Sequence, residues 1–110
     1  MSGENWVEIS EGPTGSKFHY DSDTLKAVGT GFRVWIMADH SKDKRVNERS
    51  AKDLMLIDCQ NETLTVQAYY IYGPDGQLIE GNTFKPNEQS VKPIIPGSIG
   101  AAIFDAFCKR

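Results

Sequence analysis

The sequence predicts an α+β fold, in which an antiparallel sheet of five or six strands has one C-terminal helix packed on one face. Two patterns predict it. Between residues 5 and 84, short stretches of alternating apolar and polar residues are separated by turn-forming residues, which is typical of antiparallel strands. Residues 98–108 instead carry apolar residues at helical spacing and end the chain. Because no other helix is predicted, the apolar side of this helix is expected to pack against the sheet.

Length and composition indicate one domain, which we place at residues 5–110 of the 110-residue chain. Residues 1–4 are expected to be a disordered extension, or to stand in place of a removed export signal. The net charge of −3 argues against a dedicated nucleic-acid binder, whose surface is normally basic. No stretch approaches the ~20 apolar residues that a membrane-spanning helix needs, and the first residues are not typical of a signal peptide.

The first half of the chain predicts three strands. Residues 5–10 and 17–20 flank a turn-forming run and are expected to form a hairpin. Residues 31–40 have the clearest strand pattern, with Val34 and Ile36 on one face and Trp35 and Met37 on the other. Because both faces carry apolar side chains, this strand is expected near the centre of the sheet.

The second half predicts a three-stranded meander over residues 53–60, 62–72 and 77–84. A Gly-Pro-Asp-Gly turn joins its last two strands. Residues 85–97 are proline-rich and are expected to be an extended surface loop.

The helix is predicted to begin at the N-cap Ser98. Phe104 and Cys108, four residues apart, are expected on one flank of its buried stripe. The stripe itself follows the i, i+3, i+4 spacing and comprises Ile99, Ala102, Ile103, Ala106 and Phe107.

The two cysteines, Cys59 and Cys108, leave two interpretations on composition: one structural disulfide in an exported protein, or two buried thiols in a cytosolic one. Their spacing fits neither a redox CxxC pair nor a zinc site. Their placement favours the disulfide, because Cys59 ends a predicted strand and Cys108 ends the helix that must cover the sheet. Such a bond would contribute about 4 kcal/mol in the chain-entropy model.

Three groups of residues could carry chemistry, and each has a simpler structural explanation. Asp39-His40-Ser41 contains the residue types of a hydrolase triad, but neighbours on a strand point to opposite faces and cannot form its geometry. His19 and His40 could bind a metal together with a nearby aspartate, although two unrelated histidines are expected. The acidic run from Asp21 to Thr24 could supply oxygens to calcium but is expected to form a turn. We therefore predict no catalytic residue, metal or cofactor.

Two surfaces could bind a partner. The connection at residues 42–52 is expected to be solvated, and its cations could meet an anionic polysaccharide or an acidic protein patch. A contact patch is also conceivable on the sheet face away from the helix, where Trp35, Met37 and Tyr69 could gather, although we favour a core position for these three. The candidate partner-binding cations are Lys42, Lys44, Arg45, Arg49 and Lys52.

Several single residues and short pairs, taken in their order along the chain, resemble the pattern of a known family. They are Trp6, Tyr20-Asp21, Thr24-Leu25, Val34-Trp35, Ser50, Asp58-Cys59, Tyr69, Tyr72, Pro96-Gly97-Ser98 and Cys108. This order resembles the surface-adhesin protein E family of Gram-negative bacteria. The resemblance implies an exported protein, in the periplasm or on the outer-membrane surface, with a disulfide that joins an antiparallel sheet to a C-terminal helix.

The best-known member of that family is a lipid-anchored adhesin that binds host matrix and plasma proteins. The resemblance therefore implies a non-catalytic extracytoplasmic binding module. The signal peptide and lipidated cysteine of that member do not occur in the given residues. A small enzyme or ligand carrier with an unrecognised site on the sheet, and an inhibitor of a periplasmic or host enzyme, are the alternatives. A deep polar pocket would favour the enzyme or carrier.

Overall fold

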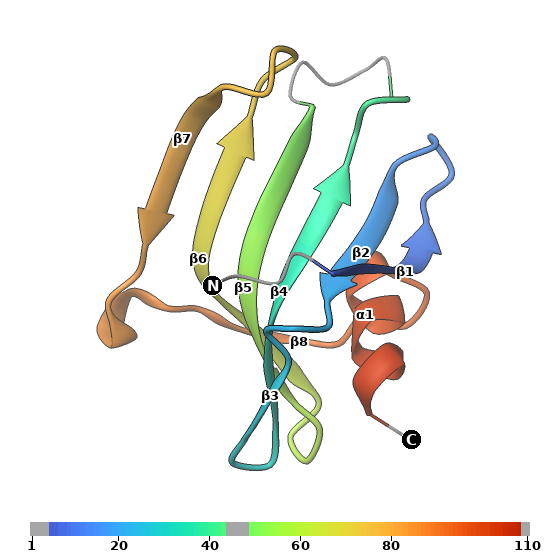
Figure 1. Cartoon of the computed structure of the whole chain (residues 1–110). Coiled ribbons are helices and arrows are strands. Elements are labelled where there is room, and N and C mark those ends of the chain that lie inside the picture. The colour runs from blue at the N-terminus through green and yellow to red at the C-terminus, as the bar shows by residue number, and fades with distance from the viewer. Residues whose placement is uncertain (1–4, 44–48, 109–110) are drawn as a thin grey trace.

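The computed structural model describes residues 5–43 and 49–108, so the predicted disordered extension at residues 1–4 lies outside the described part. The described residues form one antiparallel sheet and one α-helix, and the predicted fold class is confirmed. The six main strands lie in the order β1-β2-β4-β5-β6-β7 (Figure 1). Their bounds are β1 Trp6–Glu11, β2 Lys17–Asp21, β4 Gly31–Asp39, β5 Ser50–Asp58, β6 Thr63–Tyr72 and β7 Leu78–Thr83.

Two short strands were not predicted from the sequence. β3 (Lys26–Val28) pairs with β4, and β8 (Val91–Pro93) pairs with β6. β8 and the single 3₁₀ turn η1 (Pro86–Glu88) lie within the stretch that was expected to be an extended loop. Three residues are too few to display an alternating pattern, so neither strand could be recognised from periodicity.

Strand β5 begins earlier than expected and corrects the prediction of a solvated connection over residues 42–52. Ser50 pairs with Asp39 of β4 on one side and with Tyr72 of β6 on the other. Backbone pairing on both sides makes the strand, although Ser50, Ala51 and Lys52 lack the apolar alternation that would have identified it. Lys52 is therefore a strand residue.

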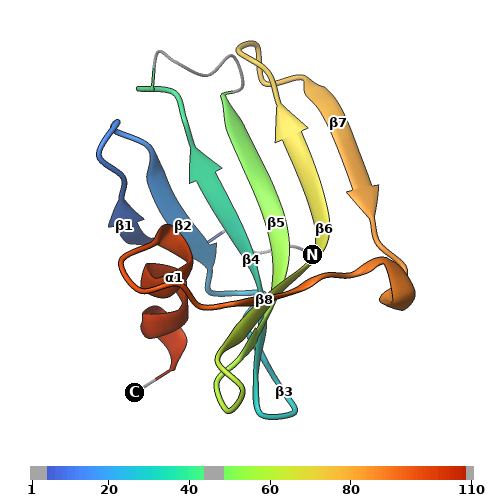
Figure 2. The same cartoon turned by 180° about the vertical axis from the view of Figure 1, so that it is seen from behind.

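The core lies between the sheet and the helix α1 (Ile99–Phe107). Seen from behind, α1 stands in front of β1 and β2 (Figure 2). Val34 and Ile57, from the central strands β4 and β5, are fully buried, as is Phe104 of the helix. The buried core cluster comprises Val34, Ile36, Ile57, Ile103, Phe104 and Cys108.

The helix begins as predicted, and Ile99, Ile103 and Phe107 of the predicted stripe lie in or against the core, but the buried face is rotated towards the predicted flank. The Ser98 side chain accepts a hydrogen bond from the Ala101 N–H at 3.1 Å, which confirms the N-cap. Phe104 is 0% exposed and lies at the centre of the buried face, whereas Ala106 is exposed. Alanines surround the helix on several sides, so periodicity could not fix its rotation. Phe104 lies one turn before Cys108, which is bonded to Cys59 at the end of β5, so both are on the side of the helix that faces the sheet.

A β-bulge between β5 and β6 reverses which residues of β6 face the core. Leu54 pairs with Ala68, but the next residue, Met55, pairs with Val66, so that Gln67 is an extra residue on β6. One extra residue shifts the alternation of side chains by one. Leu64 and Val66 therefore lie on the helix side, and the residues from Ala68 to Tyr72 have exchanged faces.

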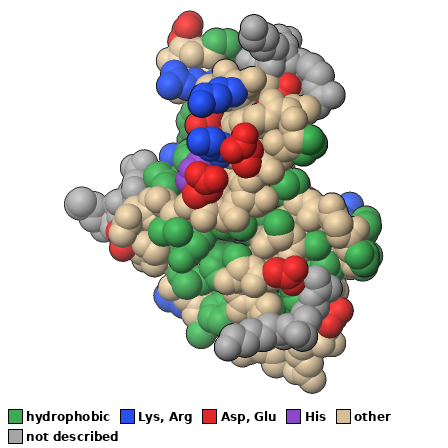
Figure 3. Space-filling view, turned by 90° about the vertical axis from the view of Figure 1, so that its right-hand side faces the viewer, with side chains coloured by type: hydrophobic (Ala, Val, Ile, Leu, Met, Phe, Trp, Pro, Cys, Tyr) green, Lys and Arg blue, Asp and Glu red, His purple; other side chains and the backbone are tan. Residues whose placement is uncertain are grey.

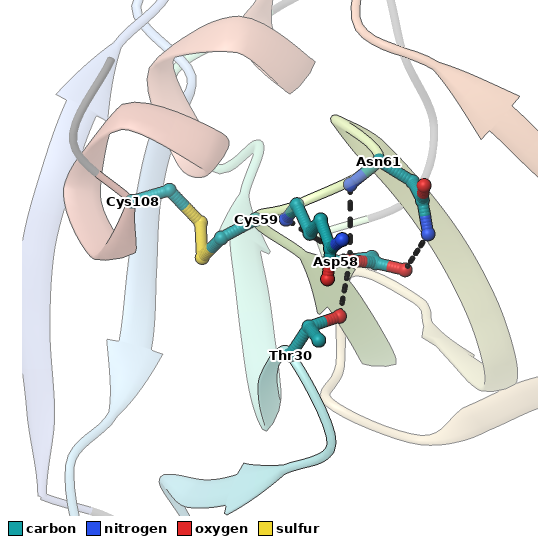
Figure 4. Close-up of a disulfide and its surroundings, with 6 residues drawn as sticks. Thr30, Asp58, Cys59, Asn61 and Cys108 are labelled. Atoms are coloured by element: carbon teal, nitrogen blue, oxygen red, sulfur yellow. Dashed lines mark hydrogen bonds between the residues drawn. A yellow bond between two sulfur atoms is a disulfide. The ribbon is translucent and has the colours of Figure 1, made fainter.

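The predicted disulfide is confirmed. Cys59, directly after β5, is bonded to Cys108, the C-cap of α1, with a Cα–Cα distance of 5.4 Å (Figure 4). The adjoining turn is held by Asp58, whose carboxylate accepts from Thr30 Oγ1 at 2.7 Å and from Asn61 Nδ2 at 2.8 Å. These hydrogen bonds, led by that from Thr30, lower the pKa of Asp58 below its ordinary value of 3.8.

Candidate functional site

A groove of about 290 Å³ lies on the sheet face away from α1. Its sides come from strands that are distant in sequence, because β1, β4, β5 and β6 each contribute side chains. Four of its seven residues are aromatic. We call it the aromatic groove, and its lining is Trp6, Asp21, Thr24, Trp35, Lys52, Tyr70 and Tyr72.

Trp35 and Tyr70 supply a broad aromatic surface in the groove. Their ring centroids are 5.9 Å apart and the planes are tilted by 33°. The Tyr70 ring covers Gly81 on the neighbouring strand β7, where a Cβ atom would collide with it. A glycine in a strand often marks such a close approach, so Gly81 leaves room for the position of this ring.

Lys52 brings a positive charge between two further rings. Its Nζ lies 5.6 Å from the centroid of the Trp6 ring and 5.5 Å from that of the Tyr72 ring. Both distances are within the range in which the negative face of an aromatic ring attracts a cation. The ammonium group is therefore held at the groove by aromatic walls.

Asp21 and Thr24 line the groove, and their side chains form hydrogen bonds with backbone groups next to it. Asp21 is 2% exposed, and its Oδ1 accepts the backbone N–H groups of Asn5 and Asp23, each at 3.0 Å. Thr24 Oγ1 donates to the Asp21 carbonyl and accepts the Trp35 N–H at 3.3 Å. These bonds confirm the predicted turn over residues 21–24. They also fix the chain next to Trp6 and Trp35.

None of Trp35, Met37 and Tyr69 belongs to the buried core cluster, so the core position that was favoured for them was wrong, and the alternative of a shared contact patch fails for Tyr69. Trp35 lines the groove, but Tyr69 lies on the opposite face, because the bulge at Gln67 reverses the alternation along β6. Tyr69 donates its hydroxyl hydrogen to Glu80 at 2.5 Å, and this bond raises the pKa of Tyr69 above 10.0.

Three aromatic groove residues, Trp6, Tyr70 and Tyr72, were not predicted as site residues. The face on which Tyr70 and Tyr72 lie depends on the bulge in β6, which the residue pattern does not indicate, and Trp6 lies on the separate strand β1. The one available signal was Gly81, a glycine within a predicted strand beside an aromatic-rich strand.

The predicted basic residues do not form one group among the described residues. Lys42 and Arg49 are exposed at the end of the sheet where β4 leaves and β5 enters, whereas Lys52 lies in the groove. Lys44 and Arg45 lie outside the described residues. Toward the β1 end of the sheet, the space-filling view shows basic and acidic side chains close together above an apolar region (Figure 3). That face of the molecule is of mixed charge.

Asp39, His40 and Ser41 make separate contacts rather than a catalytic arrangement: Asp39 with Ser41 in a local turn, and His40 with Ser16 from a distant part of the chain. Asp39 accepts the Ser41 N–H at 3.0 Å, and this bond is the main reason why the pKa of Asp39 is lowered. The His40 Nδ1 atom lies 2.8 Å from Ser16 Oγ. Among residues 5–43 and 49–108, no group of three or more His, Cys, Asp or Glu side chains is arranged to hold a metal ion.

No helix in the described part of the chain is long and apolar enough to cross a membrane. No curated protein and no solved structure matches the chain. A family model does match it, over residues 6–109, and this range includes every aromatic residue of the groove and both cysteines. The family is described as surface-adhesin protein E, and the chain belongs to it.

Proposed function

We propose that this chain is a non-catalytic extracytoplasmic binding module that contacts a host molecule through the aromatic groove. The observation that carries the proposal is the grouping of two tryptophans and two tyrosines around one lysine in a single groove. Large aromatic side chains are enriched among the residues that dominate binding energy at interfaces. Membership of an adhesin family supports a binding role.

The polar groups of the groove favour binding over catalysis. The hydrogen bonds of Asp21 and Thr24 hold the local backbone, and Asp21 is almost completely buried. A general acid or base must reach the proton that it transfers. These two residues are placed to maintain the shape of the groove.

The disulfide supports a location outside the cytoplasm, in the periplasm or on the outer-membrane surface. Structural disulfides persist in oxidising compartments, and thiol-reducing systems keep cytosolic cysteines reduced. The exposed cations Lys42 and Arg49, with Lys44 and Arg45 between them in sequence, remain predicted contributors to the attraction of an anionic partner.

Substitution of two adjacent tyrosines, one inside the groove and one outside it, tests the proposed function. The purified full chain is passed over immobilised decellularised epithelial matrix, and its retention is compared with that of Tyr70→Leu and Tyr69→Leu. Both variants lose one tyrosine of β6, but only Tyr70 lines the groove. Tyr70→Leu should weaken retention by about 30-fold, since a central aromatic contact contributes ~2 kcal/mol. Tyr69→Leu should retain the binding of the unchanged chain.

Urea unfolding of both variants establishes that each is folded before retention is compared. Equal retention of the two folded variants would show that the groove is not the contact surface. Absence of retention of the unchanged chain on this matrix would contradict the adhesin-type role itself.

A further inference from the structure

We infer that the sheet face with the aromatic groove binds an extended acidic peptide, in which an aromatic side chain and a carboxylate stand two residues apart. This inference rests on the proposed function, because it names the class of ligand for the same face. It follows from a second pocket beside the groove, from a pair of cations in that pocket, and from the spacing between these cations and Trp35.

A second pocket, of about 370 Å³, adjoins the aromatic groove. It shares Thr24 and Trp35 with the groove, so one ligand can occupy both. Leu25 is 37% exposed in this pocket, and Leu54 pairs with Trp35 from the neighbouring strand, so both add apolar surface beside the cations. We call it the cationic pocket, and its lining residues outside the groove are Asp23, Leu25, Lys26, Arg33 and Leu54.

Lys26 and Arg33 form a like-charge pair across two strands. Lys26 of β3 is the direct partner of Arg33 in β4, and directly opposite residues of an antiparallel pair project from the same face of the sheet. Like charges in this arrangement destabilise the sheet. Within the parts of the chain that the structure describes, neither cation forms an ion pair with a carboxylate. A bound anion would relieve the repulsion, because it would give both cations a common partner.

The cation pair and the aromatic groove are spaced like alternate side chains of an extended peptide. Arg33 lies two residues before Trp35 in β4, on the same face of the strand. Two residues of a strand span about 7 Å, which is also the spacing between side chains on one face of an extended peptide. A peptide with a tyrosine at one position and a glutamate two positions away can therefore place its ring against Trp35 and its carboxylate at the cation pair.

The charge around the cationic pocket favours a peptide over a sulfated polysaccharide. The Asp23 carboxylate lies in the same lining, and the whole chain carries a net charge of −3. Both oppose a polymer with closely spaced negative charges, of which two cations would neutralise only a small part. A peptide can present a single carboxylate. Arginine can bind a carboxylate through two parallel N–H bonds, and such charge-assisted hydrogen bonds are about twice as strong as neutral ones.

Titration of the ¹⁵N-labelled full chain with short peptides tests the charge and the spacing together. The acidic probe is Gly-Ser-Glu-Ser-Tyr-Ser-Glu-Ser-Gly, in which a glutamate lies two residues from the tyrosine in either chain direction. One comparison peptide has glutamine in place of both glutamates, and another, Gly-Ser-Ser-Glu-Tyr-Glu-Ser-Ser-Gly, has the glutamates next to the tyrosine. A heparin hexasaccharide represents the polysaccharides. The Trp35 indole N–H signal reports on the aromatic side of the contact, and the Arg33 Nε–H signal reports on the cationic side.

We expect the acidic probe to shift both signals, each comparison peptide to bind at least fivefold more weakly, and heparin to bind no more tightly than the probe. Lys26→Met should weaken binding of the probe about fivefold, since an exposed ion pair contributes up to ~1 kcal/mol. Lys92→Met is the matched control, because it also removes an exposed lysine from a three-residue strand and lies outside both pockets. It should leave the binding unchanged.

The like-charge pair also predicts an effect on stability that a structural role of Lys26 would reverse. Because the removal of one cation relieves the repulsion, Lys26→Met should unfold at a higher urea concentration than Lys92→Met. A lower urea midpoint for Lys26→Met would show that the pair stabilises the sheet, and would overturn the inference.

Three binding results would also overturn the inference. Equal binding of the glutamine peptide would show that the carboxylate is not recognised, and equal binding of the peptide with adjacent residues would show that the spacing is not. Tighter binding of heparin would indicate a site for dense polyanions. Arg33→Met should weaken binding by the same factor as Lys26→Met, and it keeps the test informative if Lys26→Met does not fold.

The proposed function can stand when this inference fails. If no peptide binds but Tyr70→Leu still weakens retention on the matrix, the aromatic groove is the contact surface for another class of ligand. In the same matrix assay, Lys26→Met should weaken retention more than Lys92→Met does. Equal retention of these two folded variants would overturn the peptide assignment alone.

Discussion

The ring of Tyr70 lies over Gly81 of the adjacent strand and fills the space that a Cβ atom would need there. A residue on the outermost main strand thus determines where a groove residue can lie. Because the Trp35 and Tyr70 rings are neighbours, a shift of one ring also changes the surroundings of the other.

Gly81→Ala should displace the Tyr70 ring and change the environment of Trp35. The expected result is a larger shift of the Trp35 indole N–H signal than Asn82→Ala produces. Asn82 is the next residue of β7 and pairs with Tyr69, on the face away from the groove. Comparable shifts in the two variants would mean that Gly81 does not position Tyr70.

Replacing both Cys59 and Cys108 by Ser should lower the free energy of unfolding by about 4 kcal/mol, which is the chain-entropy contribution of a bond spanning 49 positions. Urea unfolding of the oxidised chain and of the double variant gives this difference. A loss below about 1 kcal/mol would show that the sheet and helix hold together without the bond, since small-domain disulfides typically contribute 2–5 kcal/mol.

Phe104→Ala should cost about 3–5 kcal/mol of unfolding free energy, because the side chain is fully buried and its removal leaves a cavity. Ala106→Ser changes an exposed position of the same helix and should stay within about 0.5 kcal/mol of the parent. Urea unfolding measures both. A larger loss for Ala106→Ser than for Phe104→Ala would reverse the assigned orientation of the helix.

The lowered pKa of Asp58 predicts a specific pH dependence. Its ionised form is favoured in the folded state, so its contribution to stability is present above about pH 3.8 and is lost as the pH falls through the lower, folded-state value. Thr30→Val removes the main cause and should raise the Asp58 pKa towards 3.8. NMR titration of the side-chain carboxyl carbon measures the shift, and an unchanged pKa in the variant would refute the role of Thr30.

Those features that depend on alternation and on turn residues could be predicted from the sequence. The central strand with Val34 and Ile36, the N-cap Ser98 and the bond between Cys59 and Cys108 all follow from local pattern or from element ends. Each is decided by residues close to one another in sequence, or by a pairing that only two cysteines can make.

The aromatic groove could not be predicted, because it depends on the register between strands. The apolar positions of β6 alternate without interruption in the sequence, and only the pairing of Leu54 with Ala68 and of Met55 with Val66 reveals the extra residue. Tyr69 was therefore expected where Tyr70 lies. In the same way, Lys52 belongs to a strand because its neighbours pair with it, although its own segment is polar.

The bulge at Gln67 also divides strand β6 into two halves that are subject to different constraints. Leu64 packs against the core cluster, whereas Tyr70 and Tyr72 line the groove. Substitutions among the groove-facing residues can therefore alter what the protein recognises without repacking its interior. A lineage that keeps this bulge can diversify its ligands while it inherits the same scaffold.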